Sequence, residues 1–197
     1  MESLAPADPE LVERARHGDT QAYGLLIRRH QELAIRAGCL ITGDTSEAED
    51  AAQDAFIKAF YGLDRLQTGA SFRPWLLRIV ANEARNRQTA SRRRAAREMR
   101  AARERPGSDA APSPEALVLV DERRRALWDA LSSLREDDRL VLGYRFFFDL
   151  SEAEMAQALD CAPGTVKSRL SRALGRLRQR LRSSVWDETR PQEQIRG

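Results

Sequence analysis

Apolar residues recur every three or four positions along most of this chain of 197 residues, and no segment shows sustained alternation of apolar and polar residues. The first spacing is typical of amphipathic helices and the second of strands, so we predict an all-α fold. The predicted helices cover residues 9–18, 20–40, 46–61, 72–94, 115–134 and 137–147, followed by two helices within 150–182. In the third of these helices, Ala52, Phe56, Ala59 and Phe60 are expected to face the core.

A stretch with several Pro, Ser and Ala residues, RPGSDAAPSP at 105–114, separates the predicted helices into two groups. This composition is typical of linkers rather than of helices. We therefore expect two small helical domains joined by a flexible linker, with a helix-turn-helix in the C-terminal one. The expected boundaries are 9–95 for the first domain, 96–114 for the linker, 115–183 for the second domain and 184–197 for a polar tail.

The segment at 150–182 has local chemistry that predicts two helices and the turn between them. Ser151 can cap the first helix, and Glu154 lies three residues later, where a capping box needs it. Asp160 stands where the chain must turn, and Asp tolerates left-handed backbone geometry. Pro163 suits the first position of the following helix, where its missing N–H is not needed. Two helices joined in this way are typical of a helix-turn-helix that reads duplex DNA.

The second of these helices is basic on one side. Its apolar stripe is Val166, Leu170, Leu174, Leu177 and Leu181. The candidate DNA-binding residues off this stripe are Thr165, Lys167, Ser168, Arg169, Arg172 and Arg176. Residues near the helix N-terminus can reach base edges, and the later arginines can hold phosphates. A solvated basic face is the simpler interpretation of such a helix alone, but the capped helix and turn before it favour DNA binding.

Charge distribution says more than net charge, because Lys+Arg 33 against Asp+Glu 30 leaves only +3. Basic residues cluster at 85–105 and 167–182, and acidic residues at 44–54 and 136–138. This asymmetry indicates distinct partners on distinct surfaces. A hydrophobic content of 42% is enough for modest helical cores.

Several functional classes are not supported by the residues. Cys39 and Cys161, the only cysteines, are expected to be buried reduced thiols, and neither has metal-ligand spacing with His17 or His30. No apolar run is long enough to span a bilayer, and the polar, acidic start MESLAPADPE does not resemble a signal peptide, so we expect a cytoplasmic protein without membrane insertion. No nucleophile–base pair or phosphate-cradling Gly loop is visible, so we expect no enzyme activity, no cofactor and no small-molecule substrate.

Three segments together resemble one known family. These are AEDAAQDAFIKAFYGL at 48–63, FRPWLLRIVANEARN at 72–86 and LSEAEMAQALDCAPGTVKSRLSRALGRLR at 150–178. In this order, and across a linker, they resemble an extracytoplasmic-function (ECF) sigma factor, a group IV member of the sigma-70 family of bacterial transcription initiation factors. The resemblance covers roughly residues 11–181. It implies a factor that binds bacterial core RNA polymerase, directs it to promoter DNA and helps open the duplex, and that is masked by an anti-sigma factor.

The resemblance also implies roles for residues of the N-terminal half. The polymerase-binding candidates are Asp50, Gln53, Asp54, Phe56 and Lys58, on a helix whose acidic surface suits a basic protein partner. The candidates for reading and melting the minus-ten element are Phe72, Arg78, Asn82, Arg85 and Asn86. Asn can hydrogen-bond base edges, and Arg can stack on bases or pair with phosphates. The loop at 66–71 would hold a flipped base. The six candidates in the second half would read the minus-thirty-five element.

The chain departs from the family pattern in its helix-turn-helix, which blurs any inference about promoter sequence. Ala162 stands where the family often has a capping Ser, and Asp160 replaces the usual Gly. A stand-alone helix-turn-helix regulator remains the alternative function. It would account for 150–182, but not for the acidic helix or for the helix that carries Asn and Arg. A pure interaction module is the other alternative, although an anti-sigma factor would be a partner rather than a rival function.

Overall fold

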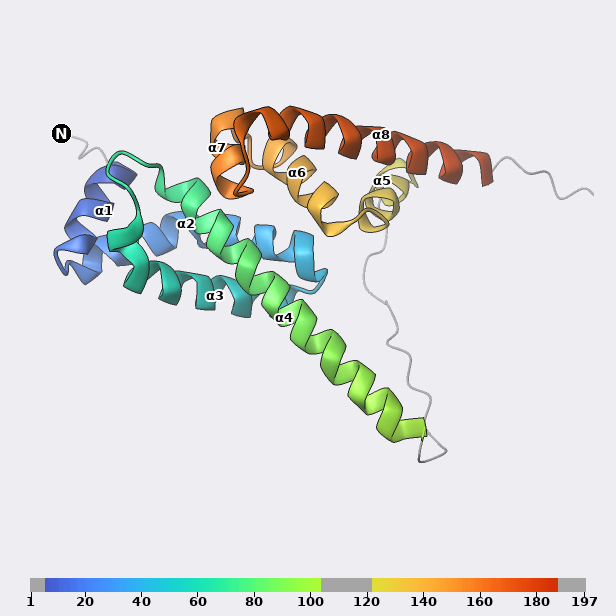
Figure 1. The fold of residues 1–197 in the computed structure, drawn as a ribbon, viewed down its shortest axis with the longest axis horizontal. Helices are drawn as coiled ribbons and strands as arrows, with labels where there is room; N and C mark the ends of the chain where they lie inside the picture. The colour runs from blue at the N-terminus through green and yellow to red at the C-terminus, as the bar shows by residue number, and fades with distance from the viewer. Residues whose placement is uncertain (1–5, 104–121, 188–197) are drawn as a thin grey trace, which may run out of the picture.

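The computed structural model describes residues 6–103 and 122–187, and within these ranges the chain forms helices and no strand. The all-α prediction is therefore confirmed for the described residues. The elements are α1 (Asp8–Arg16), α2 (Thr20–Thr42), α3 (Thr45–Gly62), the 3-10 turn η1 (Leu63–Arg65), α4 (Phe72–Arg103), α5 (Glu122–Ser132), α6 (Glu136–Phe146), α7 (Glu152–Ala158) and α8 (Pro163–Asp187). We call α1–α4 the N-terminal bundle and α5–α8 the C-terminal bundle (Figure 1).

Local side chains begin and end the helices of the N-terminal bundle. The Asp19 carboxylate accepts a hydrogen bond from the backbone N–H of Ala22 at 2.9 Å and caps α2. Gly43 ends α2 in the left-handed region, with φ of 71°, a conformation that Gly adopts without a Cβ penalty. Asp44 then caps α3 by accepting from the N–H of Glu47 at 2.8 Å. These breaks lie where the sequence predicted them.

Small residues let α2, α3 and α4 pack closely. A Cβ on Gly38 would lie 3.0 Å from the Cβ of Ala48, so α2 and α3 touch almost backbone to backbone at this point. Alanines line α3 on its buried side, and larger apolar residues of α2 and α4 fill the space between them. Fully buried members of this core are Leu26, Ala34, Ile41, Ala51, Ala55, Ala59, Leu76, Leu77 and Val80.

The fourth helix is longer than the sequence suggested. It was predicted to end near Arg94, but α4 continues to Arg103 and projects away from the bundle (Figure 1). The segment between these two residues contains no Gly or Pro and is rich in Ala and Arg, which are good helix formers. The first part of the expected linker is therefore helical. The rest of the linker, 104–114, lies outside the described residues, as does the start of the helix predicted at 115–134.

The helix-turn-helix forms as its local chemistry predicted. The Ser151 hydroxyl and the Glu154 carboxylate make a complete capping box at the start of α7. Asp160 adopts the left-handed conformation with φ of 49°, and α8 begins at Pro163. The helix continues to Asp187, beyond the predicted start of the polar tail at 184, and the remainder of the tail is outside the described part of the chain.

The two bundles pack against each other in this structure. Helix α6 lies against α2, and α7 lies against α4, so the C-terminal bundle covers one side of the N-terminal one (Figure 1). The flexible linker had suggested two domains joined only by a tether. The contact between them instead involves ion pairs, hydrogen bonds from side chains to backbone carbonyls, and buried apolar groups.

Candidate nucleic-acid interface

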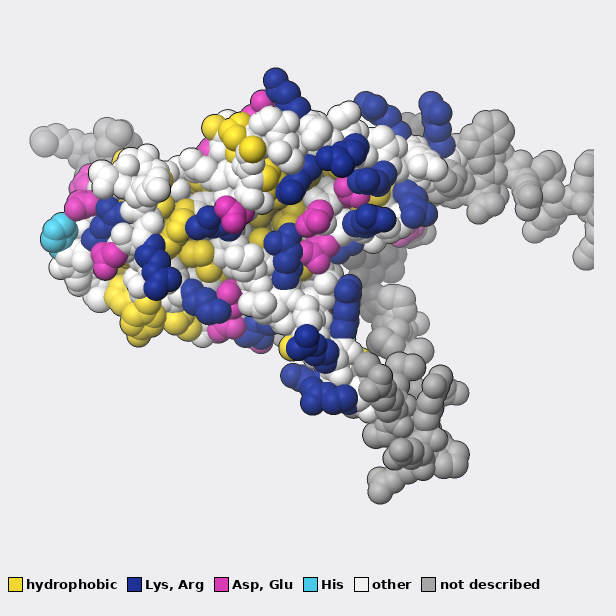
Figure 2. Space-filling model, in the orientation of Figure 1, with side chains coloured by type: hydrophobic (Ala, Val, Ile, Leu, Met, Phe, Trp, Pro, Cys, Tyr) yellow, Lys and Arg dark blue, Asp and Glu magenta, His cyan; other side chains and the backbone are white. Residues whose placement is uncertain are grey.

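The start of α8 presents polar and basic side chains to solvent. Lys167, Ser168 and Arg172 are exposed, and Thr165 and Arg169 are half-buried. Figure 2 shows Lys and Arg side chains gathered over α8 and along the projecting part of α4. The Arg172 guanidinium donates to the backbone carbonyl of Ser168 at 3.0 Å, one turn earlier in the same helix. These residues can be reached by a ligand without disturbing the core.

Lys167 and Arg176 are both engaged with acidic residues, but in different surroundings. The Lys167 ammonium lies 3.7 Å from Glu152, and both side chains are more than half exposed. Such a surface pair contributes little and exchanges readily. The Arg176 guanidinium lies 2.7 Å from Oδ1 of Asp138, whose side chain is only 10% exposed. Arg176 therefore fastens α8 to α6, a contact that the sequence did not suggest.

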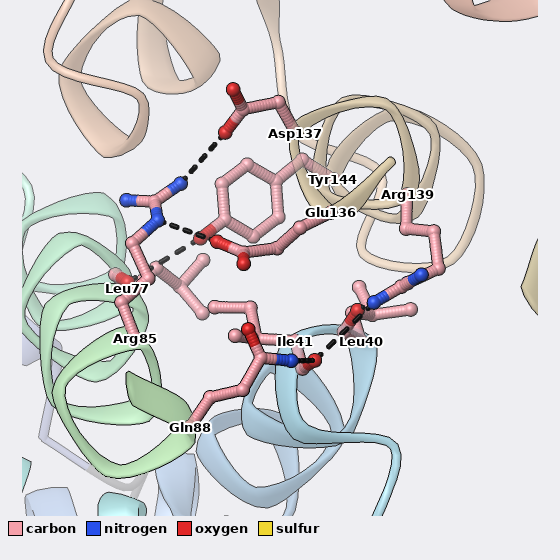
Figure 3. Close-up of polar contacts among 9 residues, drawn as sticks. All are labelled: Leu40, Ile41, Leu77, Arg85, Gln88, Glu136, Asp137, Arg139 and Tyr144. Carbon is pink, nitrogen blue, oxygen red and sulfur yellow. Dashed lines mark hydrogen bonds and ion pairs between the residues drawn. The ribbon is translucent and has the colours of Figure 1, made fainter. Parts of the chain in front are cut away.

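The minus-ten candidates on α4 fall into two groups. Asn82 and Asn86 are exposed and lie one turn apart on the same face of the helix. Arg85 is half-buried: its Nε lies 2.6 Å from Glu136 and its Nη2 lies 2.9 Å from Asp137, both on α6 (Figure 3).

The remaining minus-ten candidates are also engaged. Arg78 lies 3.3 Å from Asp160, in the turn before α8. Phe72 is only 2% exposed, and the centroid of its ring lies 5.5 Å from that of His30 and 5.9 Å from that of Trp75. Phe72 was a candidate for contact with the minus-ten element, but in this conformation it is a core residue. Trp75 is half-buried and packs against the core.

Asp50 and Asp54, the acidic polymerase-binding candidates on α3, form ion pairs with α4. Arg87 reaches across from α4 and places Nη1 2.8 Å from Asp50 and Nη2 2.6 Å from Asp54. The hydrogen bond to Asp54 is the main reason why the pKa of Arg87 is raised above its ordinary value. Lys58 lies 2.6 Å from Glu83, which is itself buried. These side chains connect helices as well as facing solvent.

An apolar groove lies between α2 and α3 beside these acids. Its volume is about 530 Å³, and Tyr23, Ile27, Ile35, Gln53, Phe56, Ile57, Phe60 and Tyr61 are among the residues that line it. Ile57 is 50% exposed and Tyr61 is 81% exposed, whereas Phe56 is almost buried at 7%. Phe60 was expected in the core but is 36% exposed. The sequence pattern that could have revealed this surface is the width of the apolar face of α3, which is greater than packing against α2 and α4 requires.

The cysteines and histidines do not form a reactive centre. Cys39 and Cys161 are free thiols and only partly buried, and burial is the main cause of the raised pKa of Cys39. His30 is buried and lies 2.7 Å from the Asp8 carboxylate, and His17 is exposed. Within residues 6–103 and 122–187, no group of three or more His, Cys, Asp or Glu side chains could hold a metal ion. No helix in the same ranges is long and apolar enough to cross a membrane.

Comparison with known proteins assigns both bundles to one family. Residues 26–97 match the model of Sigma-70 region 2, and residues 124–177 match that of Sigma-70, region 4. The chain is 36% identical to the RNA polymerase sigma-H factor of Pseudomonas aeruginosa over 172 residues, which covers 84% of this chain and 89% of that protein. It is 34% identical to the ECF RNA polymerase sigma-E factor of Escherichia coli over 174 residues, covering 84% and 90%.

Solved structures give the same result for the fold. CnrH, solved in complex with the cytosolic domain of CnrY, has a TM-score of 0.63 at 24% identity, covering 94% of this chain and all of that one. The sigma factor RpoE of Bartonella quintana, solved with the anti-sigma factor NepR, has a TM-score of 0.57 at 25% identity, covering 81% and 96%. The segments that suggested a sigma factor lie within the matched regions, and the chain belongs to the ECF sigma factors of the sigma-70 family.

Proposed function

We propose that this chain acts as an alternative sigma factor that binds core RNA polymerase, directs it to specific promoters and helps open the DNA. The observation that carries this proposal is that the region 2 and region 4 matches each coincide with an exposed surface suited to DNA. Asn82 and Asn86 lie exposed on α4, and the polar and basic start of α8 is exposed on the other bundle. A stand-alone regulator would need only the second of these surfaces.

We place the polymerase contact on the groove between α2 and α3. Exposed apolar patches on soluble proteins mark protein interaction sites, and Ile57 and Tyr61 are among the most exposed large apolar side chains described here. Asp50 and Asp54 border this surface and are 57% and 43% exposed, so a basic partner can reach them beside Arg87. The proposed contact therefore combines an apolar centre with an acidic rim, the usual arrangement of a specific protein interface.

For the minus-ten element we propose Asn82 and Asn86 as the residues that contact bases, with Arg78 and Arg85 contacting phosphates or stacking on bases. An Asn side chain offers both a donor and an acceptor to a base edge. Bases that have left the duplex expose those edges, and capturing them offsets the few kcal/mol that unstacking costs. The loop at 66–71, which lies just before α4, is the proposed site for one such base.

For the minus-thirty-five element we propose the first two turns of α8. In a helix-turn-helix the N-terminal residues of the second helix enter the major groove. Thr165, Lys167, Ser168 and Arg169 occupy that position here, and Arg172 lies one turn further on for a phosphate. Arg176, held by Asp138, is assigned mainly to the packing of the bundle.

Further proposals follow from the family. We propose a first domain at 9–95, a linker at 96–114 whose first part is the end of α4, a second domain at 115–183 and a tail at 184–197 that begins within α8. We place the protein in the cytoplasm, where transcription occurs. We infer that it is not itself an enzyme. The structures of CnrH with CnrY and of RpoE with the anti-sigma factor NepR support the inference that an anti-sigma factor binds this chain too.

The proposed function can be tested by gel filtration with purified bacterial core RNA polymerase, followed by transcription from promoter DNA. We expect the full chain to co-elute with the polymerase and the double variant Ile57→Ser/Tyr61→Ser to bind much more weakly while keeping its melting temperature. Trp128→Ser is the matched control, because Trp128 is also 56% exposed but lies on α5. Failure of the folded wild-type chain to bind polymerase would refute the sigma-factor assignment and favour a stand-alone regulator.

A further inference from the structure

The contact between the two bundles uses the arginines that the proposed function assigns to DNA. Arg85 is held by Glu136 and Asp137 at 2.6 and 2.9 Å (Figure 3). Arg78 lies 3.3 Å from Asp160. All three carboxylates belong to the C-terminal bundle. We propose that the free protein populates a closed, autoinhibited state in which these carboxylates occupy the positions that DNA phosphates take on α4.

The ionic part of this contact is built so that salt and DNA can both open it. The Arg85 side chain is 39% exposed and that of Arg78 is 41% exposed, so solvent ions reach both pairs. Pairs of this exposure are individually weak and are screened within about 10 Å at moderate salt. Together they nevertheless place carboxylates beside both Arg78 and Arg85 on α4. Phosphates that approach the same arginines must displace these charges.

Hydrogen bonds to carbonyl groups orient the C-terminal bundle on its partner. Arg139 of α6 donates through Nε to the carbonyl of Leu40 at 2.6 Å and through Nη2 to that of Ile41 at 3.2 Å. These carbonyls belong to the last turn of α2, which has no basic residue of its own. The last carbonyls of a helix lack intrahelical partners and carry its negative dipole end, so a guanidinium is well placed there. Arg73 similarly donates to the carbonyl of Phe148.

Apolar packing makes the contact specific. A Cβ on Gly143 would lie 2.2 Å from Cδ1 of Leu40, so α6 approaches α2 at a position that only a glycine allows without movement of Leu40. The next residue, Tyr144, is fully buried, and its hydroxyl donates to the carbonyl of Leu77 on α4 at 3.3 Å. A buried tyrosine hydroxyl that finds its partner in the other bundle indicates a formed interface rather than a loose encounter.

The functional consequence of closure rests on the proposed function. In the closed state Arg78 and Arg85 are occupied, whereas Asn82 and Asn86 between and beside them remain exposed. The two asparagines that would contact bases are thus exposed, but the two arginines that would bind the DNA phosphates are not available. The two bundles must also separate before α4 and α8 can reach two promoter elements. Closure therefore keeps the free factor from binding DNA until another partner opens it.

The first test measures closure in the full chain by small-angle X-ray scattering over a series of salt concentrations. The variant Glu136→Gln/Asp137→Asn/Asp160→Asn removes the three carboxylates. The control Glu32→Gln/Asp129→Asn/Asp149→Asn removes the same number of charges from exposed positions outside the ion pairs between the bundles. Asp149 has the same left-handed backbone as Asp160, with φ of 48° against 49°. We expect wild type and control to be compact at low salt and to expand as salt rises, and the first variant to expand at a clearly lower salt concentration, because it keeps only the hydrogen bonds to carbonyls and the apolar packing. An equally compact first variant would overturn the proposal.

A second variant opens the interface by size instead of charge. Gly143→Leu collides with Leu40 only when the bundles are closed, and Leu is a better helix former than Gly, so α6 itself is not weakened. We expect an expanded chain with an unchanged helical circular dichroism spectrum. Leu40→Ala in the same chain frees the space and is expected to restore compaction. If Gly143→Leu is as compact as wild type, the packing seen here is not the closed state.

The masking step is tested with a labelled single-stranded DNA 20-mer of random sequence at low salt. We expect the variant without the three carboxylates, and Gly143→Leu, to bind it several-fold more tightly than wild type and than the charge-matched control. Opened variants that bind no better would overturn the masking of α4, even if scattering confirms closure. Polymerase co-elution by the same variants separates this result from a failure of the proposed function, because none of the substituted residues lines the groove between α2 and α3.

Discussion

Arg172 and Arg176 look alike in the sequence, since each is an arginine off the apolar stripe of α8, but the structure gives them different roles. Arg172 is exposed, and among the described residues its hydrogen bonds lie within its own helix, to Ser168. Arg176 lies 2.7 Å from Asp138, whose side chain is 10% exposed and whose second carboxylate oxygen is buried with no hydrogen-bond partner among the described residues. We expect Arg172→Ala to weaken DNA binding and Arg176→Ala to weaken the fold.

The size of the second effect follows from what the substitution leaves behind. Removing one member of a fully buried ion pair costs about 3–5 kcal/mol, because the other charge loses its partner. The Arg176 side chain is 44% exposed, so water already hydrates part of it and can partly replace it. We therefore expect Arg176→Ala to lower the free energy of unfolding by about 1–3 kcal/mol. In a small domain each kcal/mol corresponds to a fall in melting temperature of about 4–8 °C.

Chemical denaturation of the full chain, followed by circular dichroism, measures this loss, and Arg172→Ala is the matched control, expected within about 0.5 kcal/mol of wild type. For duplex DNA binding we expect Arg172→Ala to have the larger effect. Loss of one phosphate contact lowers the slope of log binding constant against log salt concentration by about one unit. We expect that change for Arg172→Ala. If Arg176→Ala instead lowers the slope by one unit and leaves stability unchanged, Arg176 is a phosphate contact and the reasoning from Asp138 is wrong. Asp138→Asn in the Arg176→Ala chain should recover part of the lost stability.

Three further predictions concern the site, a helix cap and the hydrogen bond between His30 and Asp8. Asn82→Ala should impair opening of duplex promoters much more than binding to pre-melted ones, as measured by permanganate footprinting; equal loss on both would contradict base capture. Ser151→Ala removes the hydroxyl that completes the capping box with Glu154 and should cost about 1 kcal/mol in denaturation experiments, whereas Ser151→Asp should retain most of the stability. The hydrogen bond from His30 is the main cause of the lowered pKa of Asp8, so its stabilising effect is complete above the ordinary carboxyl pKa of 3.8 and is lost as pH falls through the lower folded-state value. The stability difference between wild type and Asp8→Asn should therefore be constant near neutral pH and shrink only below about pH 4; a difference that already changes well above pH 4 would contradict this assignment to Asp8.

The parts of this fold that were predictable depend on neighbours in the sequence. The capping box at Ser151, the left-handed Asp160 and the start of α8 at Pro163 all involve residues within a few positions of each other. The end of α4 was predicted too early: the predicted end coincides with the three arginines at 92–94, and arginine is a good helix former. Local rules of this kind place helices and their turns well, but they place helix ends less accurately when no Gly or Pro marks them.

The fate of each charged side chain was not predictable, because it depends on elements brought together from distant parts of the chain. Arg85 meets Glu136, 51 residues away, and Arg176 meets Asp138, 38 residues away. Amphipathic periodicity identifies such residues as off the core, and it says nothing about which carboxylate lies opposite. The exposed Tyr61 was missed as a contact residue for a related reason, since an apolar surface without a partner has the same sequence pattern as a core.

The closed state also changes how salt should act on DNA binding. Binding to phosphates releases counterions and weakens as salt rises, but opening the ion pairs at Arg78 and Arg85 takes up ions and is favoured as salt rises. In the wild-type chain these two effects oppose each other, so the measured salt slope is shallower than the number of phosphate contacts implies. A chain that lacks the carboxylates of Glu136, Asp137 and Asp160 has only the first effect. Its slope on single-stranded DNA should be steeper than that of wild type, and equal slopes would mean that these arginines are not shared between the partner bundle and DNA.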